Sequence, residues 1–89
     1  MTKYYEVQYG RWAGLVEKTR YYKHADNKIV YIEFTTKTKS KRTRVEVGTI
    51  SQMTFSAYKN SCTEITYSKF NSAMKKGIKM LFSFAAVTA

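Results

Sequence analysis

Residues 28–36 read KIVYIEFTT and form the clearest strand pattern in the chain. Its apolar and β-branched side chains recur at alternate positions, as expected for a β-strand. One face would carry Val30, Ile32 and Phe34, and the other would carry Ile29, Tyr31 and Glu33.

The same alternation extends outward to three further strands. Short connections separate them, including a turn over residues 24–27 in which the Asp26 and Asn27 side chains can bond to their own backbone. In the last of the strands, Val45 and Val47 are expected to face inward. Four strands joined by short turns favour an antiparallel meander. The predicted strands are 3–10, 15–23, 28–36 and 42–50, and the connections are 10–14, 24–27 and 37–41.

The stretch from Ser51 to Tyr58 fits two patterns. Met53, Phe55 and Ala57 alternate as in a strand, although the spacing also fits a helix. Because Thr, Phe, Ser and Tyr are weak helix formers, we expect a fifth strand here. A loop is expected over residues 60–64.

The C-terminal segment predicts an amphipathic helix. Thr66 is a suitable N-cap, and Ile65 with Phe70 has the spacing of a hydrophobic staple. Glycine in a helix costs about 1 kcal/mol relative to alanine, and a close approach of the helix to the sheet backbone would explain why Gly77 stands there. The helix is expected to end near residues 82–84. The stripe expected on the sheet comprises Phe70, Met74, Gly77, Ile78 and Leu81, with Lys69, Lys75, Lys76 and Lys79 pointing away. The predicted fold class is therefore α+β, an antiparallel four- to five-stranded sheet with one helix on one face.

Length and cysteine content indicate the number of domains and the cellular location. The 89 residues, without proline or an internal repeat, predict a single domain over 1–89. One cysteine, Cys62, cannot form an intramolecular disulfide, which favours a reducing, cytoplasmic location. The apolar stretch 78–89 is shorter than the roughly 20 residues that span a bilayer, so no membrane role is expected.

Candidates for enzymatic chemistry are few. A Cys62–His24 nucleophile pair would need a predicted loop and a predicted turn to meet, together with a third orienting group. The six acids are spread singly, and a solvated face is expected even for Glu33 and Glu46 on neighbouring strands. The sequence has neither a Gly-rich phosphate loop nor a Cys/His metal cluster. We therefore predict a protein without catalytic activity, cofactor or small-molecule ligand.

Positive charge is the most distinctive property of the chain. Sixteen Lys and Arg against six Asp and Glu give a formal net charge of +10. A hairpin tip and adjoining strand concentrate this charge, with alternate residues about 6 to 7 Å apart, close to the spacing of phosphates along a nucleic-acid strand. Such a loop could bind a phosphate backbone with release of counterions. The alternative is a solvated loop whose lysines keep the sheet edge from aggregating. The hairpin candidates are Lys37, Lys39, Lys41, Arg42 and Arg44, with weaker candidates Lys69, Lys76 and Lys79 on the helix.

Aromatic residues interleave with these cations. If the helix covers one sheet face, the other face should expose tyrosine together with arginine. That composition is typical both of a nucleic-acid stacking platform and of a protein-binding hot spot. Trp12, between two glycines, is either a lid on the core or an exposed anchor. The residues expected on this face are Tyr4, Arg20, Tyr22, Tyr31 and Arg44.

Two functional hypotheses therefore stay open. In the first, a basic module binds nucleic acid, or the nucleic-acid-binding surface of a nucleoprotein complex. In the second, a protein inhibitor or adaptor binds a host protein complex. The chain as a whole, short, tyrosine-rich and proline-free, is similar to small proteins of phages and mobile elements, and this resemblance implies an anti-defence role such as CRISPR inhibition.

Other known architectures fit less well. The RNA-recognition motif requires helices between its strands and an aromatic-glycine signature that is absent, and OB-type barrels do not usually end in a long helix. A remote alternative is a small basic toxin ribonuclease that stabilises its transition state with Lys, Arg and Tyr. The familiar toxin fold, however, places its helices before the sheet.

Overall fold

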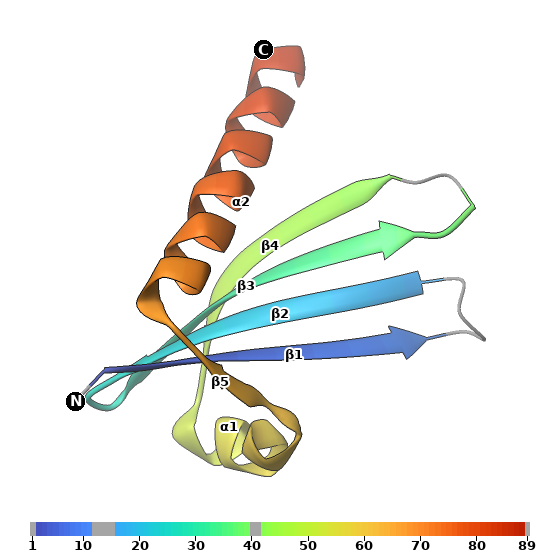
Figure 1. Cartoon of the computed structure of the whole chain (residues 1–89). Coiled ribbons are helices and arrows are strands. Elements are labelled where there is room, and N and C mark those ends of the chain that lie inside the picture. The colour runs from blue at the N-terminus through green and yellow to red at the C-terminus, as the bar shows by residue number, and fades with distance from the viewer. Residues whose placement is uncertain (1, 12–15, 40–41, 89) are drawn as a thin grey trace.

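The computed structural model describes residues 2–11, 16–39 and 42–88, which form one antiparallel sheet with helices on both of its faces (Figure 1). The sheet order is β4-β3-β2-β1-β5, so the first four strands make the predicted meander. The strands are β1 (Lys3–Arg11), β2 (Val16–Ala25), β3 (Lys28–Lys37), β4 (Thr43–Ile50) and β5 (Thr63–Ile65). The helices are α1 (Gln52–Tyr58), the short 3-10 helix η1 (Lys59–Ser61) and α2 (Tyr67–Thr88).

Strand register determines which residues of neighbouring strands share a face. Tyr5 of β1 lies opposite Tyr22 of β2, which in turn lies opposite Tyr31 of β3. The turn between β2 and β3 shortens to Asp26 and Asn27, with Asp26 in the left-handed region at φ 55°. His24, predicted in this turn, therefore belongs to β2.

Helix α2 covers one face of the sheet. Thr66 caps it as predicted, its hydroxyl oxygen accepting a hydrogen bond from the Lys69 backbone N–H at 3.2 Å. The buried face of the helix consists of Phe70, Ala73 and Gly77, which recur at helical spacing.

Two predictions about α2 are wrong. Ile78 and Leu81 are exposed, because the helix is rotated so that Ala73 and Gly77 face the sheet. The small side chains allow close packing, which larger ones on this side would prevent. The helix also continues to Thr88, beyond its predicted end at residues 82–84.

The predicted strand over Ser51–Tyr58 is also wrong, because this segment forms helix α1. Ser51 is its N-cap, and its hydroxyl oxygen accepts a hydrogen bond from the Thr54 backbone N–H at 3.1 Å. Only Phe55 of the helix is buried. Its ring packs against Tyr5 at 5.3 Å and Tyr22 at 5.1 Å between centroids, on the sheet face opposite α2.

The fifth strand comes from the segment predicted to be a loop. Strand β5 pairs antiparallel with the outer side of β1, placing Ile65 opposite Tyr4. Trp12, Gly14 and Lys41 lie outside the described residues, as does the middle of the predicted connection between β1 and β2. Among the residues described, no helix combines the length and apolar character needed to cross a bilayer.

Candidate functional site

The sheet face opposite α2 is only partly covered. Helix α1 packs over the end of this face near the β2–β3 turn, where Phe55 contacts the core. The opposite end of the sheet, where β1 connects to β2 and β3 to β4, extends beyond both helices (Figure 1). We call this uncovered part the open face. Its residues are Tyr9, Lys18, Arg20, Glu33, Thr35, Lys37, Arg42, Arg44 and Glu46.

Cross-strand register arranges the open face in rows. Arg20, Glu33 and Glu46 lie side by side in the first row. The next row toward the hairpin ends contains Lys18, Thr35 and Arg44. Beyond it, the Lys37 backbone N–H donates a hydrogen bond to the Arg42 carbonyl at 3.1 Å. Positive charge therefore increases from the first row toward the β3–β4 hairpin.

A buried carboxylate anchors the first row. Glu33 is 3% exposed, and its Oε1 accepts hydrogen bonds from the Tyr9 hydroxyl at 2.8 Å and from Arg20 Nη2 at 2.9 Å and Nε at 3.1 Å. The Lys18 ammonium lies 3.8 Å from the other oxygen, Oε2. The carboxylate thus fixes the position of the Arg20 guanidinium.

Aromatic rings complete the environment of Arg20. Its guanidinium carbon lies 4.2 Å from the centroid of Tyr31, and Nη1 donates a hydrogen bond to the Tyr22 hydroxyl at 3.4 Å. Gly48 faces Tyr31, and a Cβ there would approach the Tyr31 hydroxyl to 2.9 Å. Glycine at this position therefore leaves room for the ring that supports Arg20.

This environment shifts the pKa values of the buried groups. Burial alone would raise the pKa of Glu33, but the Tyr9 hydrogen bond and the charges of Arg20 and Lys18 outweigh it, and the pKa falls below its usual value. Burial would lower the pKa of Arg20, yet interactions with Tyr22 and Glu33 raise it. Burial raises the pKa of Tyr22, against the opposing effect of Arg20. Glu33 is therefore ionised and Arg20 protonated at neutral pH.

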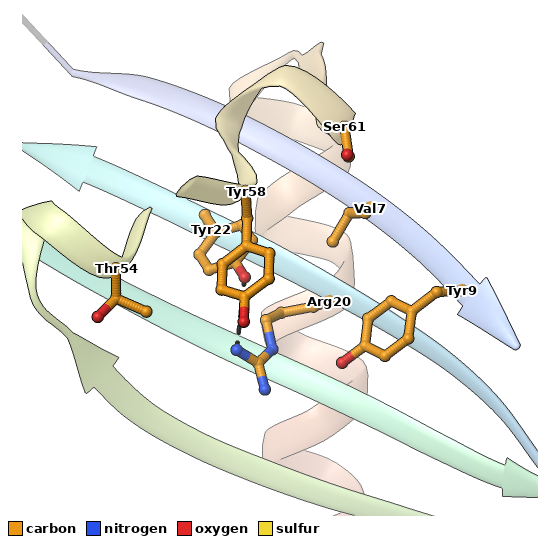
Figure 2. A pocket seen from close by; sticks show the side chains of 7 residues that line it. All are labelled: Val7, Tyr9, Arg20, Tyr22, Thr54, Tyr58 and Ser61. Atoms are coloured by element: carbon orange, nitrogen blue, oxygen red, sulfur yellow. Dashed lines mark hydrogen bonds between the residues drawn. The ribbon is translucent and has the colours of Figure 1, made fainter. Parts of the chain in front are cut away.

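A pocket of about 390 Å³ lies where α1 meets the open face. Figure 2 shows the side chains of Tyr58, from α1, and Tyr9, from β1, extending toward the Arg20 guanidinium in this pocket. Three residues of the α1–η1 segment contribute to its rim. The lining residues are Val7, Tyr9, Arg20, Tyr22, Thr54, Tyr58 and Ser61.

The predicted basic hairpin forms a second hollow, of about 580 Å³. Lys37, Arg42 and Arg44 line it together with Thr35 and Thr43. Lys39 is exposed in the turn that follows β3. Lys41 belongs to the same predicted group but lies outside the described residues.

The predicted tyrosine platform is only partly correct. Arg20, Tyr31 and Arg44 lie on the face opposite α2, as predicted. Tyr4 lies on the α2 face instead, with its ring centroid 5.1 Å from that of Phe70. Tyr22 has the predicted orientation but is 2% exposed, because Phe55 of α1 covers it.

The helix lysines do not join the hairpin cations. Lys69 pairs with Glu6 at 3.4 Å, and the Lys76 ammonium lies 5.6 Å from the Phe34 centroid, so both contact the α2 side of the sheet rather than pointing away from it. Lys79 is exposed on α2. These three lysines are therefore separated from the open face by the sheet.

Sequence reasoning missed Glu33, Lys18, Tyr9 and Tyr58. The expectation that Glu33 is solvated is wrong. A usable signal was present, because Glu33 shares an alternating face with Ile29 and Tyr31 in the most apolar strand. An acid in such a position requires a buried partner. Tyr58 carried no such signal, because its role depends on where α1 docks.

His24 and Cys62, the two residues considered for a nucleophile pair, both pack against the core. The His24 ring lies 5.5 Å from that of Phe55, and Cys62 packs against the core formed by Tyr5, Tyr22, Ile29 and Phe55. Burial raises the pKa of the Cys62 thiol, which disfavours the reactive thiolate. Within the described part of the chain, no three His, Cys, Asp or Glu side chains are grouped to hold a metal ion.

In comparisons with known proteins, no family model, curated protein or solved structure matches the chain significantly.

Proposed function

We propose that this protein is a non-catalytic module that binds nucleic acid through the open face. The observation that supports this function best is the grouping of Lys18, Lys37, Arg42 and Arg44 in consecutive rows at one end of a single sheet face. Glu33 compensates part of the charge in the first row, whereas Lys37, Arg42 and Arg44 are exposed around the hairpin hollow. An array of exposed cations on a rigid sheet suits the regularly spaced phosphates of a nucleic-acid backbone.

The test compares two variants of equal net charge. The hairpin variant combines Lys37→Ala, Arg42→Ala and Arg44→Ala. The control combines Lys23→Ala, Lys28→Ala and Lys75→Ala, three exposed lysines outside the open face. Binding to fluorescent DNA and RNA of about 12 nucleotides, single-stranded and duplex, is measured by anisotropy from about 50 to 200 mM salt.

We expect the hairpin variant to bind at least about tenfold more weakly and the control to stay close to the parent protein. The slope of log affinity against log salt should decrease by about 2 in the hairpin variant, since each lost phosphate contact contributes about 0.7 to 0.9. Equal weakening in both variants would show that net charge alone drives binding. Thermal melts of all three proteins establish that the variants are folded.

A protein inhibitor or adaptor is the second candidate, because α2 leaves apolar side chains uncovered. Ile78, Leu81 and Phe82 are exposed on the helix, and Phe82 is 72% exposed. Exposed aromatic and aliphatic groups of this kind anchor protein partners, while the surrounding positive charge speeds association with an acidic surface. A complex recovered from host lysate that survives nuclease treatment and is lost in Phe82→Ala would favour this function.

A further inference from the structure

We infer that the pocket beneath Tyr58 binds one unstacked base of a single-stranded nucleic acid, so that the protein discriminates single strands from duplexes. This inference rests on the proposed function and assigns a specific ligand group to the pocket. Its volume of about 390 Å³ lies within the range of small-ligand sites, roughly 300 to 1,000 Å³. The pocket is therefore large enough for a planar ring with part of its sugar.

The walls of the pocket present aromatic surface to a ligand. Tyr58 is 53% exposed at the C-terminal end of α1, and its ring extends over the open face toward Arg20 (Figure 2). The Tyr9 side chain also extends toward Arg20, and its hydroxyl donates a hydrogen bond to Glu33. Bases unstacked from a strand commonly stack on tyrosine rings placed in this way.

The charge of the pocket favours a base over a phosphate. The guanidinium of Arg20 is compensated by the Glu33 carboxylate at 2.9 Å, so the pocket offers a phosphate less attraction than the hairpin does. Three of the five N–H groups of Arg20 donate to Glu33 and Tyr22. Among the described residues, this leaves one N–H on each Nη for acceptors on the edge of a base.

The pocket lies next to the hairpin cations, because both occupy neighbouring rows of the same sheet face. Arg20 lies one row from Lys18 and Arg44, and consecutive rows on one face are about 7 Å apart. A strand whose base enters the pocket can therefore lay its backbone across Lys18 toward Arg44. A duplex would first have to unpair and unstack that base, at a cost of a few kcal/mol.

The experiment uses the full chain and three substitutions on α1. Tyr58→Ala removes the stacking ring, Tyr58→Phe keeps it, and Met53→Ala is the matched control, because Met53 is exposed on the same helix but does not line the pocket. Affinity is measured for DNA and RNA single strands of about 12 nucleotides and for the corresponding duplexes. Comparing the DNA and RNA single strands shows whether the site prefers deoxyribose or ribose.

The parent protein should bind single strands more tightly than duplexes. Tyr58→Ala should weaken single-strand binding about tenfold, leave duplex binding and the salt slope unchanged, and thereby remove the preference. Tyr58→Phe should retain most of the affinity, and Met53→Ala should match the parent protein.

The inference is overturned if Tyr58→Ala binds single strands as the Met53→Ala control does, or loses single-strand and duplex binding equally. In either case the proposed function survives if the hairpin variant still loses affinity and salt slope. If the parent protein binds neither form at about 150 mM salt, the proposed function fails together with the inference.

Discussion

Glu33 is the residue on which the arrangement of the open face depends most. A carboxylate taken out of water is costly unless it is paired and hydrogen-bonded, and here Arg20, Lys18 and Tyr9 meet that requirement. The same contacts hold the guanidinium against Tyr31. One buried acid thus positions the Arg20 guanidinium that lines the candidate pocket.

We predict that Glu33→Gln lowers the free energy of unfolding at pH 7 by roughly 1 to 3 kcal/mol, because Arg20 loses its buried counter-charge. The control is Glu46→Gln, an exposed acid directly opposite Glu33 on β4, which should change stability by no more than about 0.5 kcal/mol. Urea unfolding measures both variants. Equal effects in the two would mean that the Glu33 ion pairs contribute no net stability.

The lowered pKa of Glu33 predicts the direction of a pH dependence. The group favours folding fully above its unfolded pKa, near 4.5, and the contribution is lost as pH falls through the lower folded value. Unfolding experiments between about pH 7 and 2.5 should therefore show a loss of stability below pH 4.5 that is smaller in Glu33→Gln. Parallel curves for the two proteins would contradict the assigned shift.

At the scale of elements, Gly77 sets the contact between α2 and the sheet. A Cβ at this position would overlap Cδ1 of Ile32 and lie 3.2 Å from Ile32 Cγ1 and 3.3 Å from Val45 Cγ1. The helix does lie close to the sheet at Gly77, but the nearest atoms belong to side chains and not to the sheet backbone expected from the sequence. Ile32 is fully buried, so it has little freedom to move aside.

We predict that Gly77→Ala destabilises the protein, because overpacking costs roughly 1 to 3 kcal/mol and outweighs the roughly 1 kcal/mol gained in helix propensity. Ile32→Val removes the methyl group that the new Cβ would overlap. In that background Gly77→Ala should be neutral or stabilising by up to about 1 kcal/mol. A double-mutant cycle by chemical unfolding checks this, and simple additivity of the two changes would contradict it.

The contrast between the two helices shows which elements local sequence could predict. Thr66, followed by apolar residues at helical spacing, indicated α2 correctly. In α1 only Phe55 is buried, and the apolar spacing of the segment fits a strand as well as a helix, so local sequence did not decide between them. Its identity depends on the Ser51 cap and on an aromatic cluster built by β1 and β2, residues distant in the sequence.

For the whole molecule, unbalanced charge is the dominant global property. The chain carries +10, and the ion pair of Lys3 with Glu64 at 3.7 Å is solvent-exposed and contributes at most about 1 kcal/mol. The pair of Lys69 with Glu6 is partly exposed. Self-repulsion should therefore outweigh them in the folded state. The cations of the open face lie close together and contribute to this repulsion.

We predict that the melting temperature rises as sodium chloride increases from about 20 to 200 mM, because the Debye length shortens to under 10 Å and screens this repulsion. Nucleic-acid affinity should fall over the same range. Thermal melts measured by circular dichroism provide the test. A melting temperature that decreases with salt would show that attractive ion pairs, rather than net repulsion, dominate the folded protein.

The sequence by itself determined the α+β class, the four-strand meander, the capped C-terminal helix and the basic hairpin. These features follow from local periodicity, capping and turn chemistry, which act over a few residues. Tertiary structure alone decided that residues 52–58 form a helix, that β5 pairs with β1, that Tyr4 faces α2 and that Tyr22 is buried. It also brought Tyr58 and Arg20 together in one pocket. A pocket between distant segments depends on how they dock, and docking is governed by packing and by the pairing of buried charge, which local patterns do not encode.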